Sequence, residues 1–240
     1  MGREMATSQD FANYVCGPNL CNRYLTHLFR YMAPEWKRLM AGSTHNTVYM
    51  PVFQGLQVLL PPVYEQEAIA EALGDTDALI ESLEQLLTKK RHLKQGAMQE
   101  LLSGTKRLLG FSGEWEVHRL GEVADIRSGG TPSTIRPQFW DGDVLWCTPT
   151  DITALHGHKY LQQTDRRITL HGLKSSSAEM IPPLAIVMTS RATIGECAIN
   201  TVPISTNQGF KNFVPFDLID VEFLYYLLMA QRQGFISLCE

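Results

Sequence analysis

Hydrophobic side chains recur at helical spacing near the start of the chain and then change to an alternating pattern. Between Asn22 and Met40 they follow one face of a helix, which Pro34 either interrupts or restarts as a second helix. A polar turn at residues 42–46 follows. Between residues 47 and 60 apolar and other residues alternate, with a break at Gly55, and this pattern predicts a strand.

Residues 63–104 have the pattern of one long helix. Pro61-Pro62 ends the preceding segment and suits a helix start. At ~1.5 Å per residue the helix would span about 60 Å, so we expect it to join two lobes. Its apolar positions advance by alternating steps of four and three, the seam of a coiled coil with one polar interruption: Ile69, Leu73, Thr76, Ile80, Leu83 and Leu87.

Charges divide this helix into two halves. From Glu65 to Glu84 every charged residue is acidic, whereas from Lys89 onward the charges are basic except for Glu100. Both ends suit the helix dipole, so the simpler interpretation is a solvated helix. The alternative is an antiparallel partner of the same kind, which would set acid against base along the whole length. The apolar seam favours pairing.

Residues 113–240 predict a β-rich domain with short helices, because glycine and proline turns punctuate short apolar runs. Residues 185–188 and 210–214 are strand-like, and residues 223–229 are helix-like. The fold class is therefore α+β, a β-rich domain plus a long helix expected in an antiparallel coiled coil. We divide the chain into residues 1–62, 63–112 and 113–240.

Composition places the chain among globular proteins. With 240 residues and 44% hydrophobic content it has room for one large or two modest domains. The five cysteines, at positions 16, 21, 147, 197 and 239, form no paired framework, so we expect reduced thiols in the cytoplasm. We expect neither a signal peptide nor a membrane span. The net charge of −4 argues weakly against a small free-standing nucleic-acid binder, but only the surface facing DNA must be positive.

Several motifs, in order, resemble the specificity subunits of type I restriction-modification enzymes. Residues 60–70 (LPPVYEQEAIA) are similar to the start of the central spacer helix of that family, and residues 89–111 to its end and exit loop. Residues 113–133 resemble the opening of a target-recognition domain. Further matches are FWDG at 139–142 with LW at 145–146, SRA at 190–192 with IG at 194–195, TNQGF at 206–210 and GST at 42–44. The likeness covers about residues 22–235.

A complete member of this family has two target-recognition domains and two spacer helices. Here the order is the end of one recognition domain, one helix and most of a second domain, and the first eighteen residues match nothing familiar. Residues 19–60 and 113–240 would each need a complement, so two chains packed antiparallel could exchange pieces as a swapped homodimer. A fragment that folds poorly is the alternative.

The resemblance implies a non-catalytic subunit that reads double-stranded DNA and directs separate methyltransferase and restriction subunits, without a cofactor. Gly129-Gly130 would either let the main chain approach phosphates or shape the fold, and we favour the latter. We expect Trp115, Trp140 and Trp146 in the core. For DNA contacts we select polar and basic loop residues, each with the alternative role of shaping a turn: Arg127, Ser128, Thr131, Ser133, Arg136, Arg191, Asn207 and Lys211.

Enzyme signatures are missing from the sequence. There is no phosphate-binding GxxxxGK[ST] loop, and Ser190 lies in no GxSxG elbow. His156 and His158 resemble half of a metal site, but a solvated loop is the better interpretation. Two alternatives to DNA reading stay open: a coiled-coil adaptor that binds methyltransferase subunits without touching DNA, and an enzyme of unrecognised type.

Overall fold

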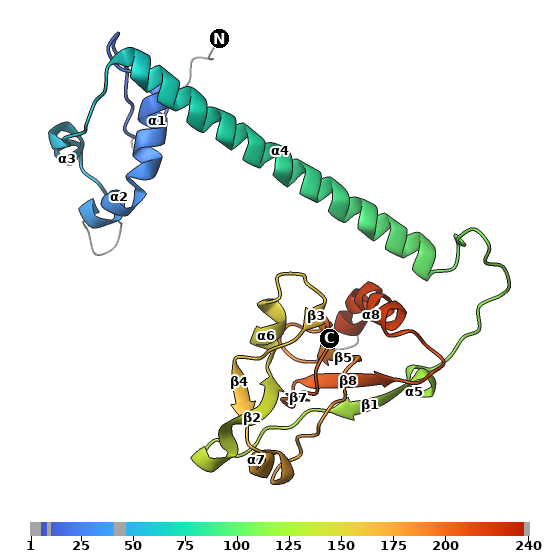
Figure 1. Ribbon diagram of the computed structural model, residues 1–240. Helices are drawn as coiled ribbons and strands as arrows, with labels where there is room; N and C mark the ends of the chain where they lie inside the picture. Colours follow the sequence, from blue (N-terminus) through green and yellow to red (C-terminus); the bar gives the residue numbers. More distant parts are fainter. Residues whose placement is uncertain (1–5, 9–10, 41–46, 238–240) are drawn as a thin grey trace. The chain divides into compact units, whose positions relative to one another are not determined.

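The structure is a computed structural model that describes residues 6–8, 11–40 and 47–237 (Figure 1). Contacts between residues divide the chain into two units, Met1–Arg91 and His92–Glu240, with the boundary inside one long helix. Each unit is described by itself.

The first unit is helical. Pro34 stands in the first turn of α2, so it begins a second helix as one of the two interpretations predicted. Helix α1 lies along the start of α4, where the Arg30 guanidinium pairs with the Asp77 carboxylate at 2.9 Å (Figure 1). The helices are α1 (Asn22–Tyr31), α2 (Ala33–Leu39), α3 (Met50–Gly55) and α4 (Val63–Leu102).

The strand predicted over residues 47–60 is wrong. Residues 50–55 form the short helix α3, and residues 56–62 have no regular structure. Pro51 lies in the first turn of α3, where its missing N–H is harmless. The helical turn lets Phe53 join an aromatic cluster, at 5.5 Å from the ring of Trp36 and 6.2 Å from that of Tyr14. The predicted polar turn at residues 42–46 lies outside the described residues.

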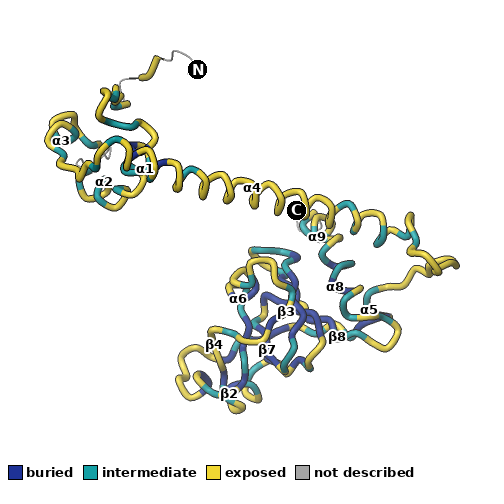
Figure 2. Tube along the Cα trace, turned by 45° about the horizontal axis from the view of Figure 1, so that its top comes forward, coloured by how far each residue is buried: buried dark blue, intermediate teal, exposed yellow. Residues whose placement is uncertain are grey.

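Helix α4 confirms the predicted long helix, since it is continuous for 40 residues. Most of it is exposed, as the yellow tube in Figure 2 shows. Within α4 only Gln66 and Ala70 are buried. Four seam residues, Leu73, Ile80, Leu83 and Leu87, are 44–54% exposed. The single chain therefore leaves the apolar seam uncovered.

The second unit combines two sheets with short helices. One sheet has the order β1-β8-β5-β6-β3 and the other the order β4-β2-β7. The strands are β1 (Ala124–Ser128), β2 (Trp140–Cys147), β3 (Tyr160–Leu161), β4 (Arg166–Ile168), β5 (Ala185–Thr189), β6 (Cys197–Asn200), β7 (Ser205–Thr206) and β8 (Phe210–Pro215). The helices are α5 (Leu120–Val123), the 3-10 turn η1 (Pro137–Phe139), α6 (Pro149–Thr153), α7 (Leu170–Lys174), α8 (Val221–Ala230) and α9 (Arg232–Ser237).

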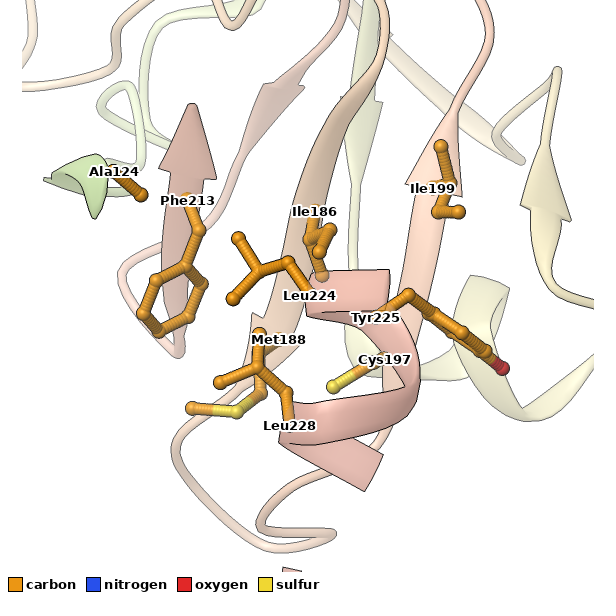
Figure 3. Packing of buried hydrophobic residues seen from close by; sticks show 9 residues of the cluster. All are labelled: Ala124, Ile186, Met188, Cys197, Ile199, Phe213, Leu224, Tyr225 and Leu228. Atoms are coloured by element: carbon orange, nitrogen blue, oxygen red, sulfur yellow. The ribbon is translucent and has the colours of Figure 1, made fainter. Parts of the chain in front are cut away.

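Strand β5 lies at the centre of the five-stranded sheet and is buried along its whole length. Helix α8 covers one face of this sheet, where Leu224 and Leu228 pack on Ile186, Met188 and Phe213 (Figure 3). A second cluster covers the other face, with Val187 and Phe210 among its members. The predicted strands at 185–188 and 210–214 and the predicted helix at 223–229 are thus confirmed, and the mixed α+β class with them.

Candidate nucleic-acid interface

The loop after β1, residues 129–136, is fixed by two tryptophans. The indole N–H of Trp146 donates to the Gly130 carbonyl at 2.9 Å, and that of Trp140 donates to the Ser133 carbonyl at 3.1 Å. Both rings are in the core, with 3% and 9% of their surfaces exposed, as predicted. Their buried N–H groups need acceptors, and the loop main chain supplies them. The main-chain path of the loop is therefore fixed by hydrogen bonds from two buried side chains.

Gly129 and Gly130 bring this loop close to two other segments. A Cβ atom on Gly129 would lie 1.9 Å from the Asn207 carbonyl oxygen, and one on Gly130 would lie 2.2 Å from the Ala178 nitrogen. No side chain fits at such distances. The geometry favours the interpretation that the two glycines shape the fold, because protein main chain already fills the space beside them.

Three of the selected residues come together at the start of this loop. Ser128 faces Lys211 across the β1–β8 pair, and the Lys211 ammonium donates to the Ser128 hydroxyl at 2.7 Å. The Thr131 hydroxyl donates to the side-chain oxygen of Gln208, in the turn before β8. Lys211 and Ser128 are exposed. Residues 83 positions apart in the sequence thus form one polar cluster.

Arg191 lies on a neighbouring loop that is fastened at several points. The Ser190 N–H donates to the Gly209 carbonyl at 2.7 Å, which ties this loop to the turn before β8. Ala192 has a left-handed main chain with φ of 59°, a strained conformation for a residue with a Cβ atom. On the far side, Arg232 of α9 donates to the Ile194 carbonyl at 3.1 Å. Arg191 is exposed at the tip of the loop.

Two selected residues have partners within the protein. The Asn207 side-chain oxygen accepts the Gly209 N–H at 2.8 Å, so this amide shapes the turn. The Arg127 guanidinium pairs with the Asp125 carboxylate at 2.7 Å on the same strand. The Asn207 contact matches the turn-shaping role that we gave as the alternative. Arg127 lies within strand β1 and not in the predicted loop, and a DNA contact of its guanidinium would have to compete with an ion pair.

The last two selected residues lie at the other end of the loop. The Ser133 carbonyl accepts the Trp140 indole N–H, and the Arg136 guanidinium lies 5.5 Å from the centre of the Phe139 ring. The loop at 129–136 thus runs from the Ser128–Lys211 cluster to an arginine on an aromatic ring.

Arg166, on β4, is a further candidate that is not among the residues selected from the sequence. Its guanidinium carbon lies 3.9 Å from the centre of the Trp140 ring and 5.1 Å from that of Trp146. These are the same two rings that hold the loop at 129–136. Nothing in the local sequence TDRRIT distinguishes Arg166 from Arg167, because the stacking depends on the pairing of β4 with β2. Only a prediction that β2 pairs with β4 would have pointed to the contact of Arg166 with the two tryptophans.

Four cations around this loop have no ion-pair partner within the described residues, a property that Arg107, Arg119, Arg167 and Lys174 of the same unit share. Over the part of the chain that the structure describes, no carboxylate lies within ion-pair distance of Arg136, Arg166, Arg191 or Lys211. By contrast, Lys159 pairs with Glu222, and this contact lowers the pKa of the Glu222 carboxyl. The exposed cations around the loop are therefore available to an external anion.

The remaining candidates are less informative. Trp115 is 45% exposed and packs edge-on against Phe223 at 6.0 Å, so the expectation of a core position is wrong for this residue. Its ring also lies 5.2 Å from the Arg107 guanidinium, so it packs between the exit loop and α8 and not inside the domain core. Within the described ranges, no three metal-ligating side chains gather, and His156 and His158 are exposed. Nor is any described helix long and apolar enough to cross a bilayer.

Comparison with known proteins decides the family. A family model for the type I restriction modification DNA specificity domain matches residues 2–89 and 112–239. The chain belongs to this family. The match begins at residue 2, which overturns the expectation that the first eighteen residues resemble nothing. In the structure the Tyr14 ring lies 4.9 Å from that of Phe29, so Tyr14 packs on α1.

Individual relatives agree with the family. The chain is 40% identical over 121 residues to the type I restriction enzyme MjaIX specificity subunit of Methanocaldococcus jannaschii, covering 50% of this chain and 28% of that protein. To the MjaVIII specificity subunit of the same organism it is 27% identical over 236 residues, covering 88% and 53%.

A solved structure shares the fold. The type I restriction-modification S subunit from M. genitalium matches with a TM-score of 0.58 at 16% identity, covering 91% of this chain and 56% of that one. The chain thus spans about half the length, or less, of the relatives named here.

Proposed function

We propose that this chain reads double-stranded DNA as the sequence-recognising part of a type I restriction-modification system and carries out no catalysis itself. The observation that supports this most is the set of exposed cations around a rigidly held loop, none of them ion-paired within the described residues. Family membership points the same way. Methylation and cleavage would belong to separate methyltransferase and restriction subunits.

The loop at 129–136, with Lys211 and Arg191 beside it, would face the major groove. There the pattern of donors and acceptors distinguishes all four base pairs. Lys211 and Arg191 suit phosphate or guanine, whereas Ser133 and Thr131 have hydroxyls that either donate or accept. Because the tryptophans already order the loop main chain, DNA binding would not have to pay for ordering it.

Selection from a random pool of DNA duplexes tests this proposal. The purified chain, with and without a methyltransferase subunit of the same system, is expected to enrich one sequence pattern. Lys211→Ala should weaken binding to the enriched sequence about tenfold, because a charge-assisted contact is lost. Lys106→Ala is the control and should leave binding unchanged, since Lys106, which follows α4, already pairs with Glu100. A pool that stays random under both conditions would refute DNA reading and favour the adaptor.

We also propose that α4 pairs with a second copy of itself in antiparallel orientation. The exposed seam of Leu73, Ile80, Leu83 and Leu87 supports pairing, and the division into acidic and basic halves supports that orientation. Each copy would then set its acidic residues against the basic residues of the other. The two copies would exchange their helical segments and recognition domains as a swapped homodimer.

Light scattering after size exclusion tests the pairing. The full chain should be a dimer at micromolar concentration, and Ile80→Glu with Leu83→Glu should make it a monomer, because two buried charges would oppose the seam. Glu81→Gln with Glu84→Gln is the matched control on the same turns and should weaken pairing only slightly. A well-folded wild-type monomer would contradict the pairing and leave the DNA-reading proposal standing.

A further inference from the structure

Arg166 has the best-defined orientation of the candidate cations. Its guanidinium lies on the face of Trp140 at 3.9 Å, in the corner that Trp140 makes with Trp146. The two indoles meet edge to face, with centres 5.0 Å apart and planes at 86°. Both indoles are fixed in turn by their hydrogen bonds to the loop at 129–136. The position of the guanidinium is therefore set by two buried side chains that are themselves hydrogen-bonded.

Stacking leaves the donors of this group unused. The five N–H bonds of a guanidinium lie in its plane, so a ring against its face blocks none of them. No protein acceptor bonds the Arg166 guanidinium within the described part of the chain, and no carboxylate pairs with it. The residue is exposed. An exposed guanidinium with unused donors is thus restricted in position by the two rings.

A fixed fork suits a base better than a phosphate. Arginine reads guanine through two parallel hydrogen bonds to O6 and N7, and this requires the guanidinium to lie in the plane of the base. A phosphate accepts donors from many directions, so a mobile lysine serves equally well there. From this geometry we infer that Arg166 is a specificity-determining residue that contacts a guanine in the major groove. The inference rests on the proposed DNA-reading function.

Arg167 provides a matched control on the same strand. It faces Leu145 across the β2–β4 pair, whereas Arg166 faces Trp146, so the two side chains point to opposite faces. Arg167 is equally exposed and stacks on neither indole. Both residues carry the same charge, but only the guanidinium of Arg166 is held against the two indole rings.

The test compares Arg166→Lys with Arg167→Lys by selecting bound duplexes from a random pool, using the full chain with its methyltransferase subunit. Lysine keeps the charge and loses the planar fork. In Arg166→Lys the preference for guanine at one position of the selected site should fall about tenfold or more. The dependence of binding on salt should stay the same, because no phosphate contact is lost. Arg167→Lys should leave the guanine preference unchanged.

A second variant separates base reading from a purely structural role. Glutamine suits adenine, so Arg166→Gln should move the preference at that position from guanine toward adenine. A structural role would lower the melting temperature and reduce binding to every sequence equally.

Two outcomes would overturn the inference. The first is a wild-type pattern retained in both Arg166 variants, and the second is a guanine preference lost equally in Arg167→Lys. If the wild-type complex selects no sequence at all, the proposed function fails and this inference fails with it.

Discussion

Buried polar side chains fix the main chain at single residues. Gln66 is fully buried, and its side chain accepts the Cys21 N–H at 2.8 Å and donates to the carbonyls of Pro61 and Asn19 at 2.7 and 3.1 Å. This one amide ties two segments, residues 19–21 and Pro61, to the first turn of α4. It explains physically why glutamine stands in the motif that revealed the resemblance, since a shorter or apolar side chain would leave three partly buried main-chain groups without this partner.

The close approach at Gly129 gives a residue-scale prediction. Gly129→Ala should lower the free energy of unfolding by about 2–4 kcal/mol, because its Cβ would overlap the Asn207 carbonyl, which is main chain and cannot rotate away. Denaturant unfolding measures the change. Gly121→Ala is the control, since nothing lies within 4 Å of its Cβ position. Equal stability of the two variants would contradict the close approach.

A second prediction at the scale of the residue concerns the buried thiol of Cys197 and the pH dependence of stability. Burial raises the pKa of Cys197 from 9.0 to about 12. Between these values the unfolded chain loses the thiol proton and the folded chain keeps it, so stability is lost as pH rises from 9 to 12. The slope for one such group approaches about 1.4 kcal/mol per pH unit. Cys197→Ala should flatten the measured dependence, and an unchanged slope would contradict the assignment.

At the scale of elements, the hydrophobic pattern predicted α4, α8, β5 and β8, and it failed for residues 47–60. The 40 residues of α4 carry a helical pattern over many turns, and the runs of β5 and β8 are apolar segments between turn residues. Residues 47–60 gave only a few alternating positions, and the aromatic contacts of Phe53 with Trp36 decided their structure instead. Those contacts join residues 17 positions apart, which local pattern cannot show.

The candidate site was predictable in part for the same reason. Arg191 could be selected from residue type and its position in a loop, whereas Lys211, also selected as a loop residue, lies on strand β8. That Lys211 meets Ser128, or that Arg166 meets Trp140, follows from the pairing of β1 with β8 and of β4 with β2. Neither pairing has a local sequence signal, because each depends on the whole topology of the sheets.

Helix α8 gives a prediction at the scale of elements. Leu228→Ala should destabilise the second unit by about 2–5 kcal/mol, since this side chain is buried between α8 and the five-stranded sheet (Figure 3). Leu218→Ala is the matched control, because Leu218 is exposed just before α8. Thermal unfolding followed by circular dichroism compares them, and similar melting temperatures would show that α8 does not hold the sheet.

At the scale of the whole molecule, the charges are unevenly distributed. The chain carries −4 overall, yet Arg136, Arg191 and Lys211 lie around the loop at 129–136, and the charged residues of α4 between Glu65 and Glu84 are all acidic. The acidic half of the helix would discourage DNA from binding along it, because phosphates repel carboxylates.

This distribution predicts a weak salt dependence. If Arg136, Arg191 and Lys211 contact phosphates, the logarithm of the binding constant should fall with the logarithm of salt concentration with a slope of about −3 per recognition surface. Titrations of DNA binding between 50 and 200 mM salt (about the range over which such slopes are measured) give the value. A slope steeper than about −6 would mean that the basic half of α4 also contacts DNA.

The two indole hydrogen bonds have a consequence for how such a protein changes its target. Trp140 and Trp146 hold carbonyl groups, which every amino acid possesses, so the side chain at position 133 is free to vary while the backbone keeps its course. At position 131 only the hydroxyl contact with Gln208 would be lost. New target sequences would then arise by point substitution on an unaltered scaffold. The same property makes this segment a natural place to randomise when a new recognition sequence is sought.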